Sequence, residues 1–367
     1  MGDYDIQRVT VDAVMPSFSV GGSERVMLSL LSGLDKCKFD IRLLVLNPTG
    51  PMQQAAVGIE NVQLVGSPRL SSALPKLMKL VSSRKPDILF GSQAHVNLAL
   101  SVLSWFVPKS SLVLREANMP SLCLREGHWP FWYKWAYRLL LPRADHVIAT
   151  SGIMASEFIN DFAVPESRVT ILPNPVDVDT IREKAIPADR RDGAGRRFIA
   201  VGRLERQKGF DRLIDWMATT DSNDHLTIVG EGSQRPLLER KLSQCDYRDR
   251  ISLAGMKQNP WSCVAGADAF LMSSRWEGLP NAVLEALAVG TPVIVTRESG
   301  GIHDIADAAP VGAVTIADTE ADFVAAMKNV KPCTVPELRP TLLPEIYYGK
   351  NVSAAFEMLL LKLRKSG

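Results

Sequence analysis

The chain has 367 residues, of which 46% are hydrophobic, and carries a formal net charge of +2. This length suits two domains better than one, and the hydrophobic content supports a core in each. So small a net charge gives no indication of nucleic-acid binding. No window reaches the 18 or more apolar residues of a membrane span, and the polar start MGDYDIQRV does not resemble a signal peptide. We therefore expect a cytoplasmic protein without nucleic-acid partners.

The first half of the chain alternates short β-branched runs with helical patterns, which is typical of a doubly wound parallel sheet. Strands are predicted at residues 8–15, 39–47, 61–65, 86–91, 111–116, 145–151 and 168–173. Helices are predicted near residues 23–34, 70–84, 95–106, 129–141 and 152–162.

The second half repeats this alternation. Strands are predicted at residues 197–202, 225–230, 250–255, 268–274, 292–296 and 313–316, with helices between them. The turn-rich segment 174–197 is the best linker. A last helical pattern, from about Ile346 to Lys365, has no strand after it. We predict an α/β protein of two Rossmann-like domains, residues 1–175 and 176–345, followed by a helix at 346–367.

A glycine-rich loop follows the first predicted strand. The segment MPSFSVGGSERVMLSLL, residues 15–31, reads as strand, loop and helix. Gly21 and Gly22 allow the backbone to approach a ligand closely. The fingerprint G-x-G-x-x-G is absent, which disfavours a nicotinamide dehydrogenase.

Two cations stand at the end of a strand in the second domain. In VGRLERQKGFDRLIDW, residues 201–216, Arg203 comes just after the predicted strand 197–202 and Lys208 just before the next helix. Ligands of open α/β sheets bind at such carboxyl ends. Fixed cations there would stabilise a leaving group whose negative charge grows as its bond breaks.

Two carboxylates bracket a helix start in SSRWEGLPNAVLEALAVGTPVIVT, residues 273–296. Pro280 suits the first helical position and Gly290 the residue just past the end. Glu277 then precedes the helix and Glu285 lies in its second turn, so both can face one ligand. The helix N-terminus between them favours anions.

These two segments resemble the G-R-L-x-x-x-K-G motif and the glutamate-bracketed motif of the retaining GT-B glycosyltransferases, specifically glycosyltransferase family 4. The resemblance implies two domains facing across a cleft, with the C-terminal helix returning to the first domain. It further implies that a hexose-type sugar passes from a UDP- or GDP-sugar to a glycan or lipid-linked acceptor. In this family such reactions often build bacterial cell-envelope polysaccharides, including lipopolysaccharide.

The resemblance also assigns roles to individual residues. It implies that Arg203 and Lys208 contact the donor pyrophosphate, that Glu277 attends the donor sugar and that Glu285 binds the ribose hydroxyls. A diphosphate leaves well once its charge is neutralised, so the acid that a glycosidase needs is dispensable here. The other donor contacts that the resemblance implies are Gly22, Met256 and the backbone amides of Gly278, Leu279 and Asn281.

One departure from the family pattern concerns the acceptor side. Many relatives carry a histidine after the strand that is predicted here at 111–116, whereas this chain has Arg115, Glu116 and Asn118. We take these three residues, with His128, as candidates for the acceptor side and assign no catalytic histidine.

The sequence D-V-D at Asp177 and Asp179 matches the metal-binding motif of glycosyltransferases with another fold. Here it stands in the predicted linker before a helix, where aspartate is a good cap. We predict no metal requirement and no cofactor.

The segment GHWPFWYKWAYRLLLPR, residues 127–143, has three tryptophans, several basic residues and no acidic one. Such a pattern suits a membrane surface. It suits equally a packed helix that lines the acceptor site, and both interpretations stay open. In the first case the protein attaches peripherally to the inner face of a bacterial plasma membrane.

Two rival functions share the nucleotide-sugar site. A sugar-nucleotide epimerase of the same fold needs acid and base groups at the sugar and no acceptor site. A non-catalytic sugar-nucleotide-binding protein could lose Glu277 and keep Arg203 and Lys208. Because all three residues are present, the sequence favours a transferase.

Overall fold

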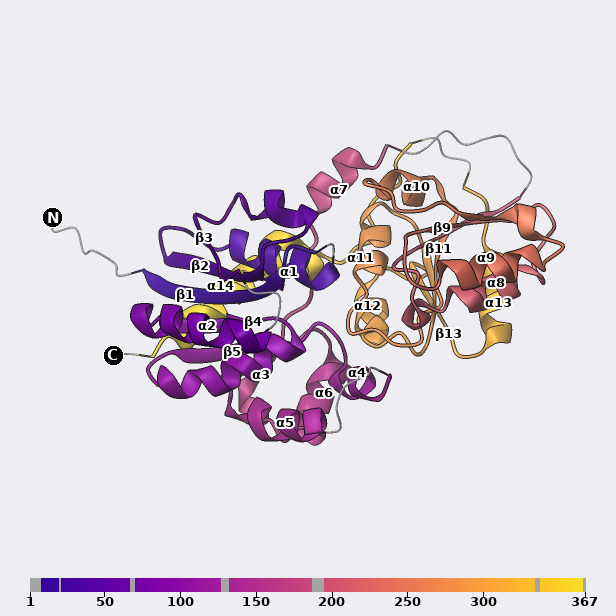
Figure 1. The fold of residues 1–367 in the computed structure, drawn as a ribbon. Coiled ribbons are helices and arrows are strands. Elements are labelled where there is room, and N and C mark those ends of the chain that lie inside the picture. The colour runs from indigo at the N-terminus through magenta and orange to yellow at the C-terminus, as the bar shows by residue number, and fades with distance from the viewer. Residues whose placement is uncertain are drawn as a thin grey trace. The chain divides into compact units, whose positions relative to one another are not determined.

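The computed structural model describes residues 8–19, 21–66, 70–126, 132–186, 195–333 and 337–365. The chain divides into two compact units: Met1–Pro175 with Gly349–Gly367, and Val176–Tyr348. Each unit has its own parallel sheet with helices on both faces (Figure 1). This arrangement confirms the predicted class of two Rossmann-like α/β domains.

The first unit holds a seven-stranded sheet in the order β3-β2-β1-β4-β5-β6-β7. All its ladders are parallel, because each strand is reached by a crossover on a face of the sheet. The seven strands of the first half are confirmed. They are β1 (Val9–Ser17), β2 (Phe39–Asn47), β3 (Asn61–Leu64), β4 (Ile88–Gly91), β5 (Ser111–Arg115), β6 (His146–Ala149) and β7 (Val169–Ile171).

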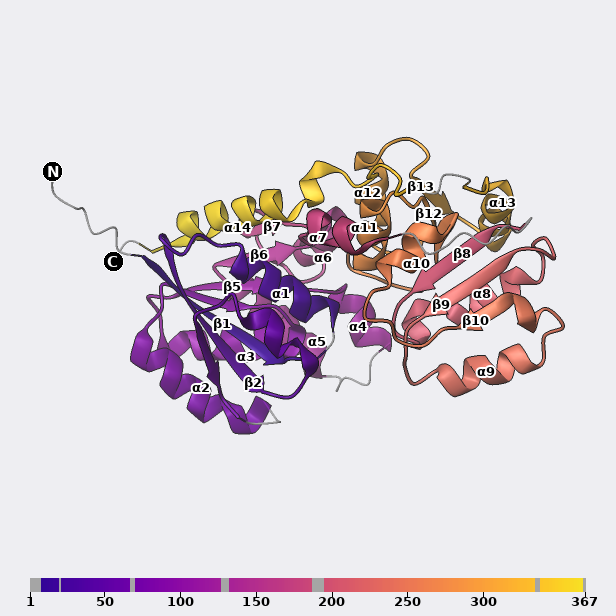
Figure 2. The same cartoon turned by 90° about the horizontal axis from the view of Figure 1, so that it is seen from above.

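Helices cover both faces of this sheet. They are α1 (Gly22–Ser32), α2 (Leu70–Arg84), α3 (Ala94–Leu103), α4 (Pro120–Glu126), α5 (Trp132–Leu140), α6 (Gly152–Asn160) and α14 (Gly349–Leu363), with the 3₁₀ turns η1 (Pro51–Ala56), η2 (Ser104–Phe106), η3 (Leu141–Arg143) and η4 (Glu166–Arg168). Successive strand residues point to opposite faces, so Met15 packs with α1 and α14 while Val14 packs with α2, α3, α5 and α6. Figure 2 shows α14 and α2 on opposite sides of the sheet. The C-terminal helix therefore returns to the first unit, where Phe356 meets Phe90.

The second unit holds a six-stranded parallel sheet in the order β10-β9-β8-β11-β12-β13. Its strands, all predicted, are β8 (Arg197–Val201), β9 (His225–Val229), β10 (Ile251–Leu253), β11 (Ala269–Met272), β12 (Val293–Thr296) and β13 (Val314–Ala317). One face carries α7 (Val178–Lys184), α10 (Trp261–Gly266), α11 (Asn281–Ala288) and α12 (Ile302–Ala308), and the other carries α8 (Phe210–Met217), α9 (Arg235–Ser243) and α13 (Glu320–Asn329). The 3₁₀ turns are η5 (Arg206–Lys208), η6 (Arg248–Arg250) and η7 (Glu345–Tyr347).

The strand order of the second sheet determines where its functional loops meet. β8 pairs with β9 on one side and with β11 on the other. The direction in which the chain winds therefore reverses between β8 and β11. Loops that leave the carboxyl ends of these two strands diverge to opposite faces, and ligands of open α/β sheets bind at this switch point.

Some boundaries differ from the prediction. Helix α11 begins at Asn281 and has eight residues, because Pro280 has an extended ψ of 103° and acts as the N-cap instead of the first helical residue. Gly290 follows the helix in the left-handed region, with φ of 77°, as predicted. The predicted helix 95–106 ends earlier and continues as η2. Helix α4 was not predicted, because its seven residues are too few for a periodic pattern. Residues 129–131 and 187–194 of the predicted helix and linker lie outside the described residues.

Candidate functional site

The loops after β8 and β11 bring a cation and a carboxylate into contact. Lys208 Nζ donates a hydrogen bond to Glu277 Oε1 at 2.5 Å. Ser274 Oγ donates to the same oxygen at 2.8 Å. The side chains of Lys208 and Glu277 are only 18% and 7% exposed. Two of the three residues assigned to catalysis from the sequence thus form a sheltered ion pair, although 69 positions separate them.

Hydrogen bonds to backbone carbonyls hold these two loops together. Gln207 Nε2 donates to the Trp276 carbonyl at 2.9 Å, and the Arg275 amide donates to the Gln207 carbonyl at 2.7 Å. Gly209 is left-handed, with φ of 65°, and a Cβ on it would lie 2.1 Å from the Ser273 carbonyl oxygen. A side chain at position 209 would therefore separate the loops. Sequence reasoning missed Gln207, although it lies directly before Lys208 in the segment 201–216.

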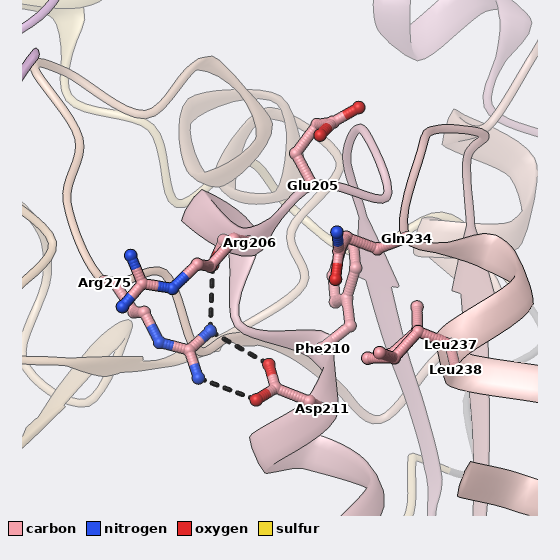
Figure 3. A pocket seen from close by; sticks show the side chains of 8 residues that line it. All are labelled: Glu205, Arg206, Phe210, Asp211, Gln234, Leu237, Leu238 and Arg275. Atoms are coloured by element: carbon pink, nitrogen blue, oxygen red, sulfur yellow. Dashed lines mark hydrogen bonds and ion pairs between the residues drawn. The ribbon is translucent and has the colours of Figure 1, made fainter. Parts of the chain in front are cut away.

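A pocket of about 220 Å³ lies beside these loops (Figure 3). In it the Arg275 guanidinium donates to both carboxylate oxygens of Asp211, at 2.9 and 2.6 Å, and to the Arg206 carbonyl. Burial opposes ionisation of Asp211, but the hydrogen bonds from Arg275 lower its pKa. Neither Lys208 nor Glu277 lines this pocket. The contacts of Arg275 with Asp211 and with the Arg206 carbonyl fix η5 against the loop after β11.

Arg203 is exposed and lies at the start of the loop after β8. The next residues of the loop are fixed: the Leu204 amide donates to the Glu231 carbonyl at 2.9 Å, and Glu205 accepts from the amide and hydroxyl of Ser233. The backbone hydrogen bond from Ser233, helped by the charge of Arg203, lowers the pKa of Glu205. The loop after β9 therefore supports the backbone from which Arg203 projects.

Glu285 lies half-buried in the second turn of α11. Its Oε2 accepts a hydrogen bond from Trp261 Nε1 at 2.9 Å. Trp261, the first residue of α10, was not identified from the sequence, because nothing in its spacing links it to Glu285. The indole orients the carboxylate that the prediction assigns to the ribose.

The glycine turn at residues 299–301 packs directly on the loop of Glu277. The Gly301 amide donates to the Gly278 carbonyl at 2.8 Å. Gly300 has φ of 58°, and a Cβ on it would lie 2.0 Å from the Glu277 carbonyl oxygen. Of the other predicted donor contacts, Gly278 and Leu279 are buried, Asn281 is half-buried as the first residue of α11, and Met256 is 65% exposed after β10.

In the first unit, the glycine loop is occupied by a carboxylate of its own chain. Gly22 is exposed at the first position of α1. Buried Glu24 accepts hydrogen bonds from Ser19 Oγ, Ser23 Oγ and Gln93 Nε2 at 3.2, 2.7 and 2.9 Å. Sequence reasoning missed Glu24, because its partner Gln93 is 69 positions away in the sequence.

Two of the predicted acceptor-side residues lie inside a hydrogen-bonded network. Arg115, 1% exposed, donates to Ser92 Oγ at 3.1 Å and to Asn174 Oδ1. Glu116, 3% exposed, accepts on Oε1 from Tyr137 Oη at 2.6 Å and from Asn97.

Burial shifts the ionisation of this network. It raises the pKa of Glu116 to about 7, against the opposing effect of the hydrogen bonds from Tyr137 and Asn97. It also lowers the pKa of Arg115 to about 10. Arg115 and Glu116 are buried at the carboxyl end of β5, and half-buried Asn118 follows them in the loop. His128 lies outside the described residues.

The D-V-D segment has a structural role. Asp177 is the N-cap of α7 and accepts a hydrogen bond from the Thr180 amide at 3.1 Å. Within the described ranges, no group of three or more histidine, cysteine, aspartate or glutamate side chains could hold a metal ion. No helix in that part of the chain is long and apolar enough to span a membrane.

Two family profiles match adjoining parts of the chain. The family described as Glycosyltransferase Family 4 matches residues 20–180, and the family described as Glycosyl transferases group 1 matches residues 181–339. Together they extend over most of both units.

Individual relatives are more distant. The chain is 24% identical over 325 residues, 86% of its length and 88% of the relative's, to an N-acetylgalactosamine-N,N'-diacetylbacillosaminyl-diphospho-undecaprenol 4-alpha-N-acetylgalactosaminyltransferase of Campylobacter jejuni. It is 33% identical over 168 residues, 44% of its length and 45% of the relative's, to a lipopolysaccharide 1,6-galactosyltransferase of Escherichia coli K12.

Solved structures share the fold. Anabaena HepE in complex with UDP-glucose matches with a TM-score of 0.73 and 14% identity, over 97% of this chain and 99% of that one. The lipopolysaccharide outer core galactosyltransferase WaaB matches with a TM-score of 0.72 and 18% identity, over 96% and 99%.

Proposed function

Because the chain belongs to the group 1 glycosyltransferases of family 4, we propose that it moves a hexose-type sugar from a UDP- or GDP-sugar to a glycan or lipid-linked acceptor. The reaction retains the anomeric configuration and serves cell-envelope polysaccharide synthesis. The names of two relatives support this choice, since one acts on a diphospho-undecaprenol acceptor and the other on lipopolysaccharide.

The contact between Lys208 Nζ and Glu277 Oε1 carries this proposal. It brings a cation suited to a diphosphate next to a carboxylate suited to a sugar, at the switch point where open α/β sheets bind ligands. Because both side chains are sheltered from water, their charges act more strongly on a bound donor than surface charges would.

In the proposed reaction the bond from the anomeric carbon to the diphosphate oxygen breaks, and a bond to the acceptor hydroxyl oxygen forms on the same face of the sugar. The hydroxyl proton passes to the departing diphosphate. Lys208 and Arg203 stabilise the negative charge that grows on the diphosphate. Glu277 positions the sugar.

The nucleotide is held through its ribose. A carboxylate can accept two hydrogen bonds from a cis-diol, and Glu285 is held for this role by the Trp261 indole. Met256, exposed in the loop after β10, contacts the base. No metal takes part, so the two cations alone neutralise the diphosphate.

The acceptor binds at the carboxyl edge of the first unit, near Asn118 and the network of Arg115 and Glu116. A lipid-linked acceptor places the protein at the inner face of the plasma membrane.

The test is a transfer assay with a panel of UDP- and GDP-sugars and an undecaprenyl-diphosphate-linked saccharide as acceptor. We expect nucleoside diphosphate release that depends on the acceptor, and a product with the anomeric configuration of the donor by NMR. Conversion of the donor to an epimer without any acceptor would establish the epimerase instead. A donor that only stabilises the fold, by about 2.7 kcal/mol at 100 times its dissociation constant, and is never consumed would indicate a binding protein.

A further inference from the structure

The outer face of α5 exposes large apolar side chains. Trp132, Trp135 and Leu139 are 52%, 69% and 66% exposed. Their spacing of three and four residues places them on one stripe of the helix. Tyr133 and Tyr137 are buried on the opposite stripe, within the core of the first unit. Helix α5 therefore has two apolar faces: one packs on the first unit, and the other is exposed in the part of the chain that the structure describes.

The tertiary structure extends this stripe with residues from another segment. In η2, Trp105 and Phe106 are 56% and 60% exposed. The guanidinium of Arg143 lies over the Trp105 ring, 5.0 Å from its centroid. Arg143 follows Leu139 by four residues, and α3, which leads into η2, packs against α5 and η3. We call these residues the aromatic face: Trp105, Phe106, Trp132, Trp135, Leu139 and Arg143.

The two segments that carry the aromatic face have charges of one sign only. Residues 102–109 and 132–143 contain Lys109, Lys134, Arg138 and Arg143, all exposed, and no aspartate or glutamate. On α5, Lys134 and Arg138 lie between the buried tyrosines and the exposed stripe. Tryptophan and basic side chains in this arrangement are typical of helices that lie in the interface of a membrane.

We propose that the aromatic face docks on a lipid bilayer that contains anionic lipids, with α5 lying in the plane of the headgroups. A second copy of the chain fits this surface poorly, because a symmetric contact would bring the four cations of each copy together. An anionic bilayer complements them.

This docking gives the acceptor edge a defined height above the membrane, a consequence that rests on the function proposed above. On the inward side of α5, Tyr137 donates its hydrogen bond to Glu116, at the carboxyl end of β5. The width of a helix, about 10 Å, therefore separates the acceptor edge from the bilayer. A headgroup layer is roughly 5–8 Å thick, so the saccharide of a lipid-linked acceptor extends to the height of this edge.

Vesicle co-sedimentation of the full chain tests the docking without any sugar substrate. We expect binding to vesicles of phosphatidylcholine with phosphatidylglycerol, and much weaker binding to phosphatidylcholine alone. Trp132→Ala with Trp135→Ala should lower the partition coefficient at least about ten-fold, because two interfacial aromatic rings are lost. Lys134→Glu with Arg138→Glu should lower it by at least about 25-fold on the anionic vesicles, since each cation contributes a factor of about five.

Matched controls change equally exposed residues elsewhere. Val57→Ser with Met358→Ser, at positions 83% and 66% exposed, and Arg240→Glu with Lys328→Glu should bind like the unchanged protein. All eight substitutions of the test and control pairs change exposed side chains and should leave the fold intact, which circular dichroism checks. Unchanged protein that stays in the supernatant with both vesicles, a tryptophan variant that binds normally, or a lipid-independent dimer that the tryptophan changes abolish would each overturn the proposal.

Transfer to a water-soluble acceptor separates this inference from the proposed function. If the protein binds vesicles but transfers no sugar, the docking stands and the proposed function fails. If it transfers sugar to the soluble acceptor but does not bind vesicles, the docking fails and the proposed function stands.

Discussion

The change Lys208→Ala tests the assignment of the leaving-group cation most directly. Lys208 Nζ lies 2.5 Å from Glu277 Oε1, and the two side chains are only 18% and 7% exposed. At an effective dielectric constant of about 20, two unit charges 4 Å apart interact by about 4 kcal/mol. A diphosphate oxygen at a similar distance would gain a comparable amount as its charge develops. We therefore expect a loss of about 2.7 to 4 kcal/mol of transition-state stabilisation, which is about 10² to 10³ in kcat/KM.

The assay is the initial rate of nucleoside diphosphate release, with kcat and KM determined separately. Because the charge on the diphosphate grows as the bond breaks, kcat should fall more than the donor affinity. Arg212→Ala is the matched control: Arg212 forms a more exposed ion pair with Glu298 at 3.3 Å, and its loss should change the rate less than about two-fold. Thermal unfolding checks that Lys208→Ala remains folded, since Glu277 then loses its cation and keeps its contacts with Ser274 and Gln207. A folded variant with a rate within three-fold of the unchanged protein would refute the reasoning.

Three further predictions concern other parts of the protein. Burial raises the pKa of Glu116 from 4.5 to about 7, so the folded state binds this proton more tightly than the unfolded state. The free energy of unfolding should consequently fall by roughly 2 to 3 kcal/mol between pH 5 and pH 8. Glu116→Gln, measured by urea unfolding, should remove that part of the fall. The same pH dependence of the free energy of unfolding in both proteins would contradict this. Glu285→Ala should weaken binding of the nucleoside diphosphate by about 1 to 3 kcal/mol in calorimetry, since the ribose loses a charged hydrogen-bond acceptor, and unchanged affinity would exclude that role. Exhaustive chelation should leave transfer at full rate, whereas a loss that manganese restores would show a metal requirement.

The strands and their order along the chain could be predicted because buried parallel strands are continuous apolar runs, such as PVIVT before residue 297. Helix boundaries were less certain. Pro280 is compatible with either the N-cap or the first helical position, and its ψ angle decides between them. Helix α4 has too few residues to show a period.

The sequence by itself determined the chemical inventory of the site: cations at 203 and 208, carboxylates at 277 and 285, and glycines where loops approach closely. It could not determine which of these groups touch. Lys208 meets Glu277 because β8 pairs with β11, and nothing in either segment encodes that pairing across the two intervening strands. The Trp261 indole likewise reaches Glu285 through a tertiary contact, the packing of α10 on α11.

The tertiary structure also determined which side of α5 is buried. Its sequence has apolar stripes on two sides, one of tyrosines and one of tryptophans and leucine, so its periodicity fits either side toward the core. Packing buries Tyr133 and Tyr137, because the Tyr137 hydroxyl finds a hydrogen-bond acceptor in buried Glu116. Trp132 and Trp135 are left exposed on the opposite face.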